Sequence, residues 1–154
     1  MPDTNFAALS GADTIVIGGN LLVDLMDGDV GTIEFPNDLV TVKAGKDGNT
    51  AFALNAAGRM AQMKLRVVLG GPSDALFTSW MNWIEQDFAS FALLSGTIVK
   101  RVGNGISGMA MVTYVLSGGV IKKKPAMTSN VEGNTDQAVP VWEFTFAHAI
   151  RLVA

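Results

Sequence analysis

The sequence predicts a mainly β fold, an antiparallel β-sandwich or barrel with one flanking α-helix at about residues 73–91. Apolar side chains recur mostly at every second position, which is typical of strands that bury one face. Glycine-rich turns punctuate these segments, and the chain holds 17 glycines in 154 residues. A helical period occurs in one stretch alone. Because long helical crossovers between strands are missing, a doubly wound α/β fold is disfavoured.

The first quarter of the chain reads as short strands separated by turns. Residues 14–17 are β-branched, Gly18-Gly19-Asn20 turns the chain, and residues 21–25 form a return strand. Residues 30–35 alternate again. Pro36 ends that strand, since proline cannot donate to the ladder.

Residues 44–58 are expected to protrude as a loop or arm. The flanking segments 39–43 and 50–55 have strand patterns, whereas residues 44–49 carry no apolar side chain larger than alanine. Such a segment is typical of an exposed hairpin tip, and Ala56-Ala57-Gly58 is a second break. The residues assigned to the arm are Lys43, Gly45, Lys46, Asp47, Gly48 and Asn49.

The clearest alternation lies in residues 60–69. Its apolar side chains at odd positions face one way and its polar side chains face the other, which predicts a half-buried strand. The polar positions are Gln62, Lys64 and Arg66.

A single helix is expected after the break at Gly70-Gly71-Pro72, with Ser73 or Asp74 capping its first amides. Apolar side chains then recur at three- and four-residue steps and form one face, which is predicted to pack on the sheet. The predicted core face of the helix consists of Leu76, Trp80, Trp83, Ile84 and Phe88, followed by Phe91.

The remainder of the chain returns to strands, with a polar loop at residues 125–138. Ser117-Gly118-Gly119 is interpreted as a turn between two of these strands. The strands are expected at residues 97–102, 109–116, 120–124 and 139–153.

Composition points to association. The chain is 49% hydrophobic and only 16% charged, against about 25% charged residues in an average soluble domain. Either glycine, serine, threonine and asparagine form much of the outer surface, or an interface with another chain covers the apolar surplus. The length fits one domain over residues 1–154. No signal peptide and no membrane-spanning run is visible, so the cytoplasm of the producing cell is the simplest location.

Catalytic and metal-binding patterns are weak, and we expect no enzyme, no cofactor and no metal site. His148 is the single histidine, and no nucleophile elbow accompanies it. Residues 45–50 lack the spacing of a phosphate-binding loop. Asp24, Asp27, Asp29 and Glu34 could hold a hard cation, but ordinary solvated turns explain them better. The net charge of -3 argues against a surface that grips nucleic-acid phosphates.

Three parts of the sequence resemble the tail tube proteins of bacteriophages. They are residues 31–50, including Gly31-Thr32-Ile33-Glu34-Phe35-Pro36-Asn37-Asp38; Asn55-Ala56-Ala57-Gly58 with the alternating strand after it; and Trp142-Glu143-Phe144-Thr145-Phe146 near the C-terminus. The order of elements is also similar: strands, a long loop, a strand, one helix and further strands.

The resemblance implies a major tail tube subunit of the virion, made in the host bacterial cytoplasm. Such subunits form a β-barrel-like body and join into hexameric rings, which stack into a tube for ejection of double-stranded DNA. The implied partners are further copies of the chain, a tape-measure protein and DNA in the channel, and a sheath protein, tail terminator and baseplate. The polar sheet residues are the candidates for the channel wall: Thr32, Glu34, Gln62, Lys64 and Arg66.

Two alternatives stay open. One is another ring component of a phage tail, such as a terminator or a baseplate tube protein, which would form single rings rather than long polymers. The other is a ligand-binding β-barrel with Trp80, Trp83 and Trp142 around an apolar cavity.

Overall fold

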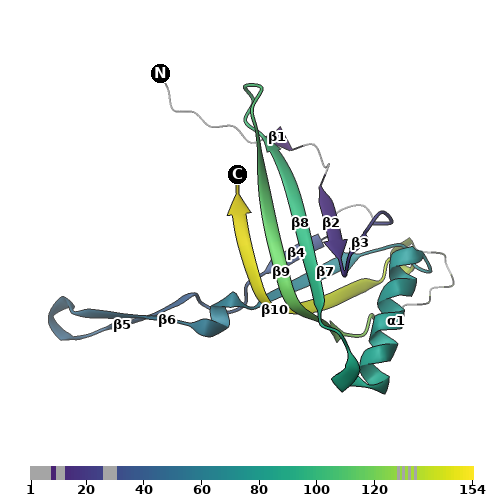
Figure 1. Cartoon of the computed structure of the whole chain (residues 1–154), viewed down its shortest axis with the longest axis horizontal. Coiled ribbons are helices and arrows are strands. Elements are labelled where there is room, and N and C mark those ends of the chain that lie inside the picture. Colours follow the sequence, from purple (N-terminus) through teal and green to yellow (C-terminus); the bar gives the residue numbers. More distant parts are fainter. Residues whose placement is uncertain are drawn as a thin grey trace.

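The computed structural model describes residues 8–9, 13–25, 31–127, 129, 131, 133 and 135–154 (Figure 1). One antiparallel sheet forms the body, a helix covers one end of it, and a separate hairpin projects from the other end. The sheet strands are β1 (Ala8–Leu9), β2 (Thr14–Ile17), β3 (Asn20–Leu21), β4 (Gly31–Glu34), β7 (Ala61–Arg66), β8 (Leu94–Gly103), β9 (Met109–Lys123) and β10 (Val141–Val153).

The strand order is β3-β2-β8-β9-β10-β7-β4, and β1 also pairs with β8. All these pairings are antiparallel, so the predicted mainly β fold with a flanking helix is confirmed. In the described part of the chain, the end strands β3 and β4 do not pair, so the sheet is not a closed barrel. It is rolled, because a Cβ on Gly31 of β4 would lie 3.2 Å from the side chain of Ile15 in β2.

The core fills the inside of this roll. Alternate residues of β7 and β10 point into it, and Met63, Leu65, Phe144 and Phe146 are fully buried or nearly so. β7 and β10 are neighbours in register, with Met63 opposite Phe144. The apolar alternation predicted for residues 60–69 therefore marks the buried face correctly at Met63 and Leu65.

β9 corrects one prediction. Residues 109–123 form one strand, and Ser117-Gly118-Gly119 is an irregularity within it rather than a turn. Leu94 lies opposite Gly119, and Gly96 lies opposite Leu116. β9 therefore contains one more residue than β8 between these pairs, as in a β-bulge. Gly118 adopts φ +65°, and a Cβ on Gly119 would overlap the Phe146 ring. Gly118 thus permits the backbone bend, and Gly119 permits the close approach of the Phe146 ring.

The helix α1 spans Pro72–Gln86, shorter than the predicted 73–91. Asp87 leaves helical geometry (φ −155°, ψ 85°), and a short 3₁₀ helix, η3, follows at Phe88–Ser90. At 15 residues, α1 lacks the length for a membrane span, and no other described helix is long and apolar enough either.

The predicted core face of α1 is partly wrong. Leu76, Trp80 and Ile84 pack against the core as partly buried side chains, but Trp83 is 41% exposed and Phe88 is 58% exposed. Phe77, which the pattern left off the face, is fully buried. Phe88 lies beyond the end of the helix and is therefore not part of its buried face. The buried face is centred on Phe77, nearer the N-terminus of the helix.

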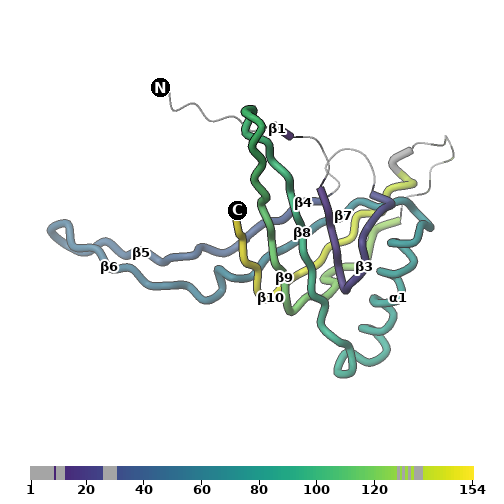
Figure 2. Tube along the Cα trace, turned by 45° about the horizontal axis from the view of Figure 1, so that its top comes forward, coloured from purple at the N-terminus to yellow at the C-terminus, as the bar shows by residue number. Residues whose placement is uncertain are grey.

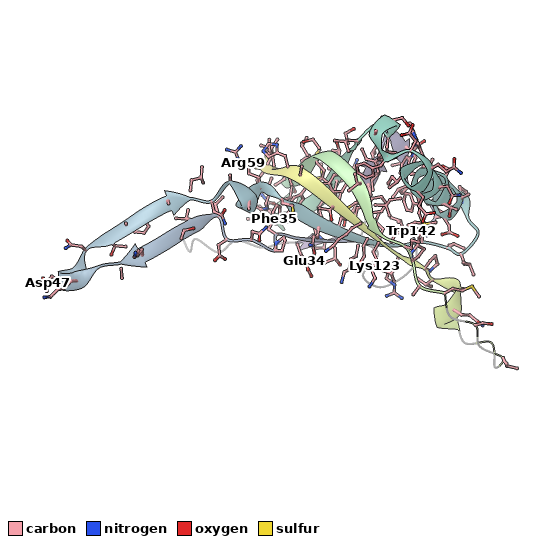
Figure 3. The ribbon with its side chains drawn as sticks, turned by 90° about the horizontal axis from the view of Figure 1, so that it is seen from below. Glu34, Phe35, Asp47, Arg59, Lys123 and Trp142 are labelled. Atoms are coloured by element: carbon pink, nitrogen blue, oxygen red, sulfur yellow. The ribbon has the colours of Figure 1, made fainter. Side chains whose placement is uncertain are left out.

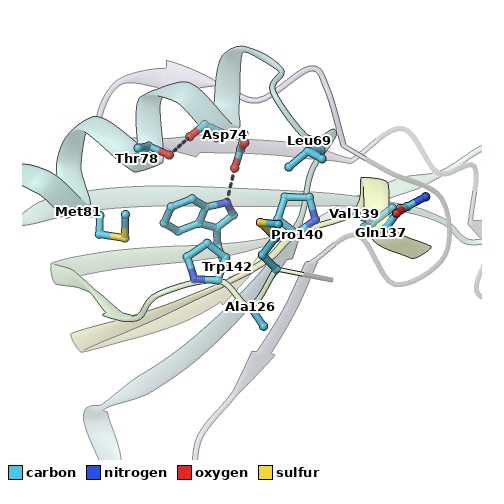
Figure 4. Close-up of a pocket in the computed structure, with 11 residues that line it drawn as sticks. Leu69, Asp74, Thr78, Met81, Ala126, Gln137, Val139, Pro140 and Trp142 are labelled. Atoms are coloured by element: carbon cyan, nitrogen blue, oxygen red, sulfur yellow. Dashed lines mark hydrogen bonds between the residues drawn. The ribbon is translucent and has the colours of Figure 1, made fainter. Parts of the chain in front are cut away.

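Aromatic packing joins α1 to the sheet. The Phe77 ring lies 5.0 Å from the Phe144 ring and 5.6 Å from the Trp142 ring, both edge to face. Trp142 Nε1 donates to Asp74 Oδ1 at 2.9 Å (Figure 4). The other oxygen, Asp74 Oδ2, accepts from the Gly70 amide at 3.0 Å. Asp74 thus fixes the start of the helix to β10 and satisfies the buried indole N–H.

Asp24 provides a second anchor at the same helix end. Its Oδ2 accepts from the Ser73 amide at 3.0 Å, and its Oδ1 accepts from the Ser73 hydroxyl. The carboxylate thereby accepts a hydrogen bond from a free amide of the first helical turn. Its negative charge also interacts favourably with the positive end of the helix dipole.

Candidate functional site

The most exposed element is a hairpin, called here the arm, which comprises β5 (Val40–Ala44), the 3₁₀ turn η1 (Lys46–Gly48) and β6 (Thr50–Leu54). It forms its own two-stranded sheet and leaves the body as a narrow ribbon with Asp47 at the tip (Figure 3). Every residue of both strands is exposed.

The tip is shaped by its turn residues. Asp47 has φ 61° and Gly48 has φ 82°, and both values lie in the left-handed region that favours glycine, aspartate and asparagine. The Asn49 side chain donates to the Lys46 carbonyl at 3.0 Å. Most residues predicted for the arm, Gly45 to Asn49, lie at this tip, and Lys43 is in β5 beside it.

One face of the arm is apolar. Val40 pairs with Leu54 and Val42 pairs with Phe52, so these four side chains share a face, which we call the arm apolar face. All four are exposed, and Phe52 is 71% exposed. The opposite face carries Lys43 and Ala51 as a directly opposed pair.

The two chain segments at the base of the arm are tied to each other. The Asn55 amide donates to the Leu39 carbonyl at 2.9 Å, and the Asn37 side chain donates to the Ala57 carbonyl at 3.2 Å. A Cβ on Gly58 would lie 2.8 Å from the Asp38 carbonyl oxygen, so only glycine permits this approach. Residues 56–58, predicted as part of the arm, belong to the 3₁₀ helix η2 (Ala56–Arg59) at its base.

The polar residues predicted for a channel wall lie on one face of the sheet, opposite the buried side chains. Glu34 pairs with Gln62, and Thr32 pairs with Lys64. Lys64 also lies opposite Glu143, and their charged groups are 3.6 Å apart. Arg66 follows at the next outward position of β7. The structure therefore brings these residues together as a mixed-charge polar surface.

A second apolar surface lies on the far part of the sheet. Met109, Met111, Val115, Ile150 and Leu152 are exposed. The three β9 residues alternate along one face, and Val115 lies directly opposite Ile150 in β10. We call these five side chains the sheet apolar face.

The alternative of a tryptophan-lined ligand cavity does not match the geometry. Trp142 lines a hollow of about 230 Å³ beside α1, together with Met81, Pro125 and Pro140 (Figure 4), but Trp80 and Trp83 do not line it. Pockets for drug-sized ligands have roughly 300–1,000 Å³. The three tryptophans therefore do not enclose one cavity.

The candidate residues for chemistry are dispersed. Within the described ranges, no three acidic or histidine side chains gather as a metal site would require. Asp24 is bonded to Ser73, while Asp27 and Asp29 lie outside the described residues. His148 forms no ion pair with any carboxylate in the described part of the chain.

The fold matches solved structures of tube-forming assemblies. A chain of the anti-feeding prophage cap, described as a tube-terminating cap, aligns with a TM-score of 0.64 at 12% identity, over 92% of this chain and 88% of that one. A chain from the sheath–tube complex of the extracellular contractile injection system PVC, in its extended state, gives 0.58 at 14% identity, over 92% and 87%.

A chain of the PVC sheath/tube terminator in the extended state gives a TM-score of 0.57 at 13% identity, over 92% of both chains. No protein-family model matches the sequence, and no curated protein matches it either. The chain shares the fold of these assembly components over almost its whole length, as the resemblance to tail tube proteins predicted.

Sequence reasoning missed the arm apolar face. It located the arm from its polar tip and assigned no role to the valine, phenylalanine and leucine beside it. Their signal was present, since Val40, Val42, Phe52 and Leu54 alternate as they would on a buried strand. The sequence pattern is the same for a buried and an exposed apolar face. Only the structure shows that the hairpin stands apart from the body, so that its apolar face is exposed (Figure 3).

Proposed function

We propose that this chain is a structural subunit of a phage-tail-like tube, which assembles with copies of itself into stacked rings. The observation that carries the proposal is the arm, a hairpin with an apolar face that no described residue of its own subunit covers. The shared fold with chains from a tube-terminating cap and a sheath–tube complex supports it.

The energetics of the arm favour a partner. An isolated two-stranded hairpin is marginally stable in water, and stable β structure needs a third strand or a packing surface. Burying a valine, leucine or phenylalanine side chain contributes about 1.5–3 kcal/mol, and the arm apolar face has four such side chains. Contact with a neighbouring subunit or ring would recover this free energy and fix the arm.

The polar surface with Glu34, Gln62, Lys64 and Arg66 is our candidate for the channel wall. Its charges are of both signs, and the whole chain carries -3, so it offers no basic stripe to hold phosphates. A tape-measure protein and double-stranded DNA would slide along such a wall. A sheath, terminator and baseplate would complete the particle, assembled in the bacterial cytoplasm.

A tube terminator is the second candidate function. Two of the three structural matches are described as tube-terminating components, a cap and a sheath/tube terminator. The two roles differ in polymerisation: hexameric rings of a tube subunit stack without limit, whereas those of a terminator stay single. Heterologous contacts of this kind close into rings or continue as open polymers according to their geometry.

Negative-stain electron microscopy of the concentrated full chain tests the proposal. Long hollow tubes would support the major tube subunit, and uniform single rings would support the terminator. A variant that lacks residues 40–54, which removes both arm strands and keeps the base from Asn55 to Gly58, should remain a folded monomer by circular dichroism and light scattering. Normal tubes from this deletion variant would contradict the role of the arm.

A matched pair of variants separates the arm apolar face from general effects of charge. Phe52→Glu places a carboxylate on that face, whereas Ala51→Glu places one on the opposite face of the same strand. We expect Phe52→Glu to abolish assembly and Ala51→Glu to retain it. Equal assembly by both variants would show that the face makes no contact.

A further inference from the structure

The loop of residues 104–108, which joins β8 to β9, is folded around one side-chain amide, and we call it the β8–β9 loop. The side-chain oxygen Oδ1 of Asn104 accepts from the Ile106 amide at 2.8 Å and from the Gly108 amide at 3.0 Å. The Asn104 amide in turn donates to the Gly108 carbonyl at 3.0 Å. Figures 1 and 2 show this loop at the end of β8 and β9 that lies away from α1. None of the contacts proposed for the arm or the channel wall involves it.

Asn104 differs from the other asparagines in its sequence neighbour and in its hydrogen bonds. It is the one asparagine of the chain that precedes a glycine. Asn20, Asn37 and Asn49 each donate through the side-chain nitrogen to a backbone carbonyl. Asn104 instead accepts two amides at Oδ1, and its Nδ2 donates to no described group. Its side-chain carbonyl is therefore polarised, and its amide nitrogen is free to leave.

The next backbone nitrogen is placed in the sequence to attack this carbonyl. Gly105 has no Cβ to hinder the attack, and its amide donates no hydrogen bond within the described part of the chain. Attack of the Gly105 nitrogen on Cγ of Asn104 closes a five-membered imide ring and develops negative charge on Oδ1. The Ile106 and Gly108 amides already donate to that oxygen, which is the arrangement of an oxyanion hole.

We propose that Asn104 is a site of spontaneous deamidation and that the β8–β9 loop promotes the reaction. A bond forms between the Gly105 nitrogen and Cγ of Asn104, the bond from Cγ to Nδ2 breaks, and the proton of the Gly105 amide leaves with the nitrogen as ammonia. Water then opens the imide. Cleavage at Cγ gives aspartate, and cleavage at the backbone carbonyl gives isoaspartate. Water is the single co-reactant, and both residues are exposed to it.

The modification changes the charge of the loop. Either product adds one negative charge to a chain whose net charge is -3. An aspartate keeps an acceptor for the Ile106 and Gly108 amides and binds them more strongly, because hydrogen bonds to a charged oxygen are stronger. An isoaspartate lengthens the main chain and disturbs the backbone bond between residues 104 and 108. The inference is independent of the proposed function, since it needs no second copy of the chain.

Mass spectrometry of the full chain after incubation at mildly alkaline pH tests the inference. Trypsin cleaves after Arg101 and Lys122 and releases a peptide in which Asn104 is the one asparagine. We expect Asn104 to deamidate about tenfold faster in the folded chain than in guanidinium chloride, the worth of one hydrogen bond that strengthens as the imide forms. A folded rate equal to or below the unfolded rate overturns the inference, because the sequence alone would then account for the reaction.

Asn55 is an internal reference in the same samples. Its Oδ1 also accepts from the amide two residues on, that of Ala57, but at 3.2 Å and as a single bond, and Ala56 follows it in place of a glycine. We expect Asn55 to stay unmodified over the period in which Asn104 reacts. Equal conversion of the two asparagines in the folded chain would contradict a special role of the β8–β9 loop.

A matched pair of glycine variants tests the loop geometry while the Asn104-Gly105 sequence stays intact. A Cβ on Gly108 would overlap the Asn104 side-chain amide, so Gly108→Ala displaces that amide from its two donors. A Cβ on Gly48, at the tip of the arm, meets no atom within 4 Å. We expect Gly108→Ala to slow deamidation to the unfolded rate and Gly48→Ala to retain the wild-type rate. A folded Gly108→Ala variant, verified by circular dichroism, that reacts as fast as the wild type would overturn the inference.

Discussion

The body and the arm use the same strand pattern and reach opposite outcomes. In β7 and β10 alternate apolar residues enter the core, where Met63, Leu65 and Phe144 have almost no contact with solvent. In β5 and β6 the alternation is equally regular, yet Val42 and Phe52 remain exposed. The two regions differ in what lies opposite the apolar face, which is helix α1 and the rolled sheet in one case and solvent in the other.

Alternation therefore specifies a strand with one apolar face, but it does not specify what covers that face. In the body, a single subunit supplies the cover. In the arm, we propose that another subunit does. Truncation of apolar residues in the body should therefore lower the stability of the fold. Truncation of apolar residues in the arm should instead impair the association of subunits.

Phe77→Ala should give the largest effect. Phe77 is fully buried and contacts Trp142, Phe144 and Trp80, so truncation should lower the free energy of unfolding by about 3–5 kcal/mol. Phe52→Ala on the arm should change it by less than about 0.5 kcal/mol. Urea unfolding of the monomer measures both, and similar losses would erase the distinction between the regions.

Asp74→Ala should follow in size. It leaves the buried Trp142 indole N–H and the Gly70 amide without their acceptor, at a cost of about 1.5–3 kcal/mol. Asp38→Ala, which removes the same charge at the exposed base of the arm, should cost less than about 0.5 kcal/mol. Thermal unfolding with tryptophan fluorescence compares the two, and an unchanged midpoint for Asp74→Ala would refute the anchoring role.

Gly119→Ala tests the bulge of β9. The added methyl group would overlap the Phe146 ring and force it to move, which should cost about 1–3 kcal/mol. Gly48→Ala at the tip of the arm meets no atom within 4 Å, and its left-handed backbone is strained only locally. The body should unfold at lower denaturant concentration in the first variant only, as far-ultraviolet circular dichroism would show.

Lys64→Ala should have the smallest effect. Its ion pair with Glu143 spans 3.6 Å and is open to solvent, so its loss should change stability by less than about 1 kcal/mol. Denaturant unfolding at low and high salt should show little difference between variant and wild type. A larger loss would mean that this polar surface stabilises the body.

The sequence predicted most of the body because its signals are local. Alternation marked the buried face of residues 60–69, and a strand was predicted correctly at residues 139–153. Gly70-Gly71-Pro72 marked the start of the helix, but the predicted cap was wrong, because Gly71 is the N-cap residue and neither Ser73 nor Asp74 caps the helix. The end of the helix was missed because Asp87 breaks it inside an apolar pattern that continues to Phe91. Periodicity alone cannot distinguish one long helix from a helix followed by a 3₁₀ turn.

Features that depend on neighbours could not be predicted. Ser117-Gly118-Gly119 has the composition of a turn, and only pairing with β8 and β10 on both sides keeps β9 continuous through it. The arm was located from residues 44–49, but its apolar face is recognisable only once the hairpin stands apart from the sheet. The pairing of β10 with β7 stops at Phe146 because β7 begins at Ala61, and no property of residues 147–153 reveals this.

Sedimentation velocity of the wild-type chain over a wide concentration range tests the central claim most directly. If other copies cover the arm apolar face, the distribution should shift with concentration from the 16.2 kDa monomer to rings and longer assemblies. A single 16.2 kDa species at every concentration would contradict it.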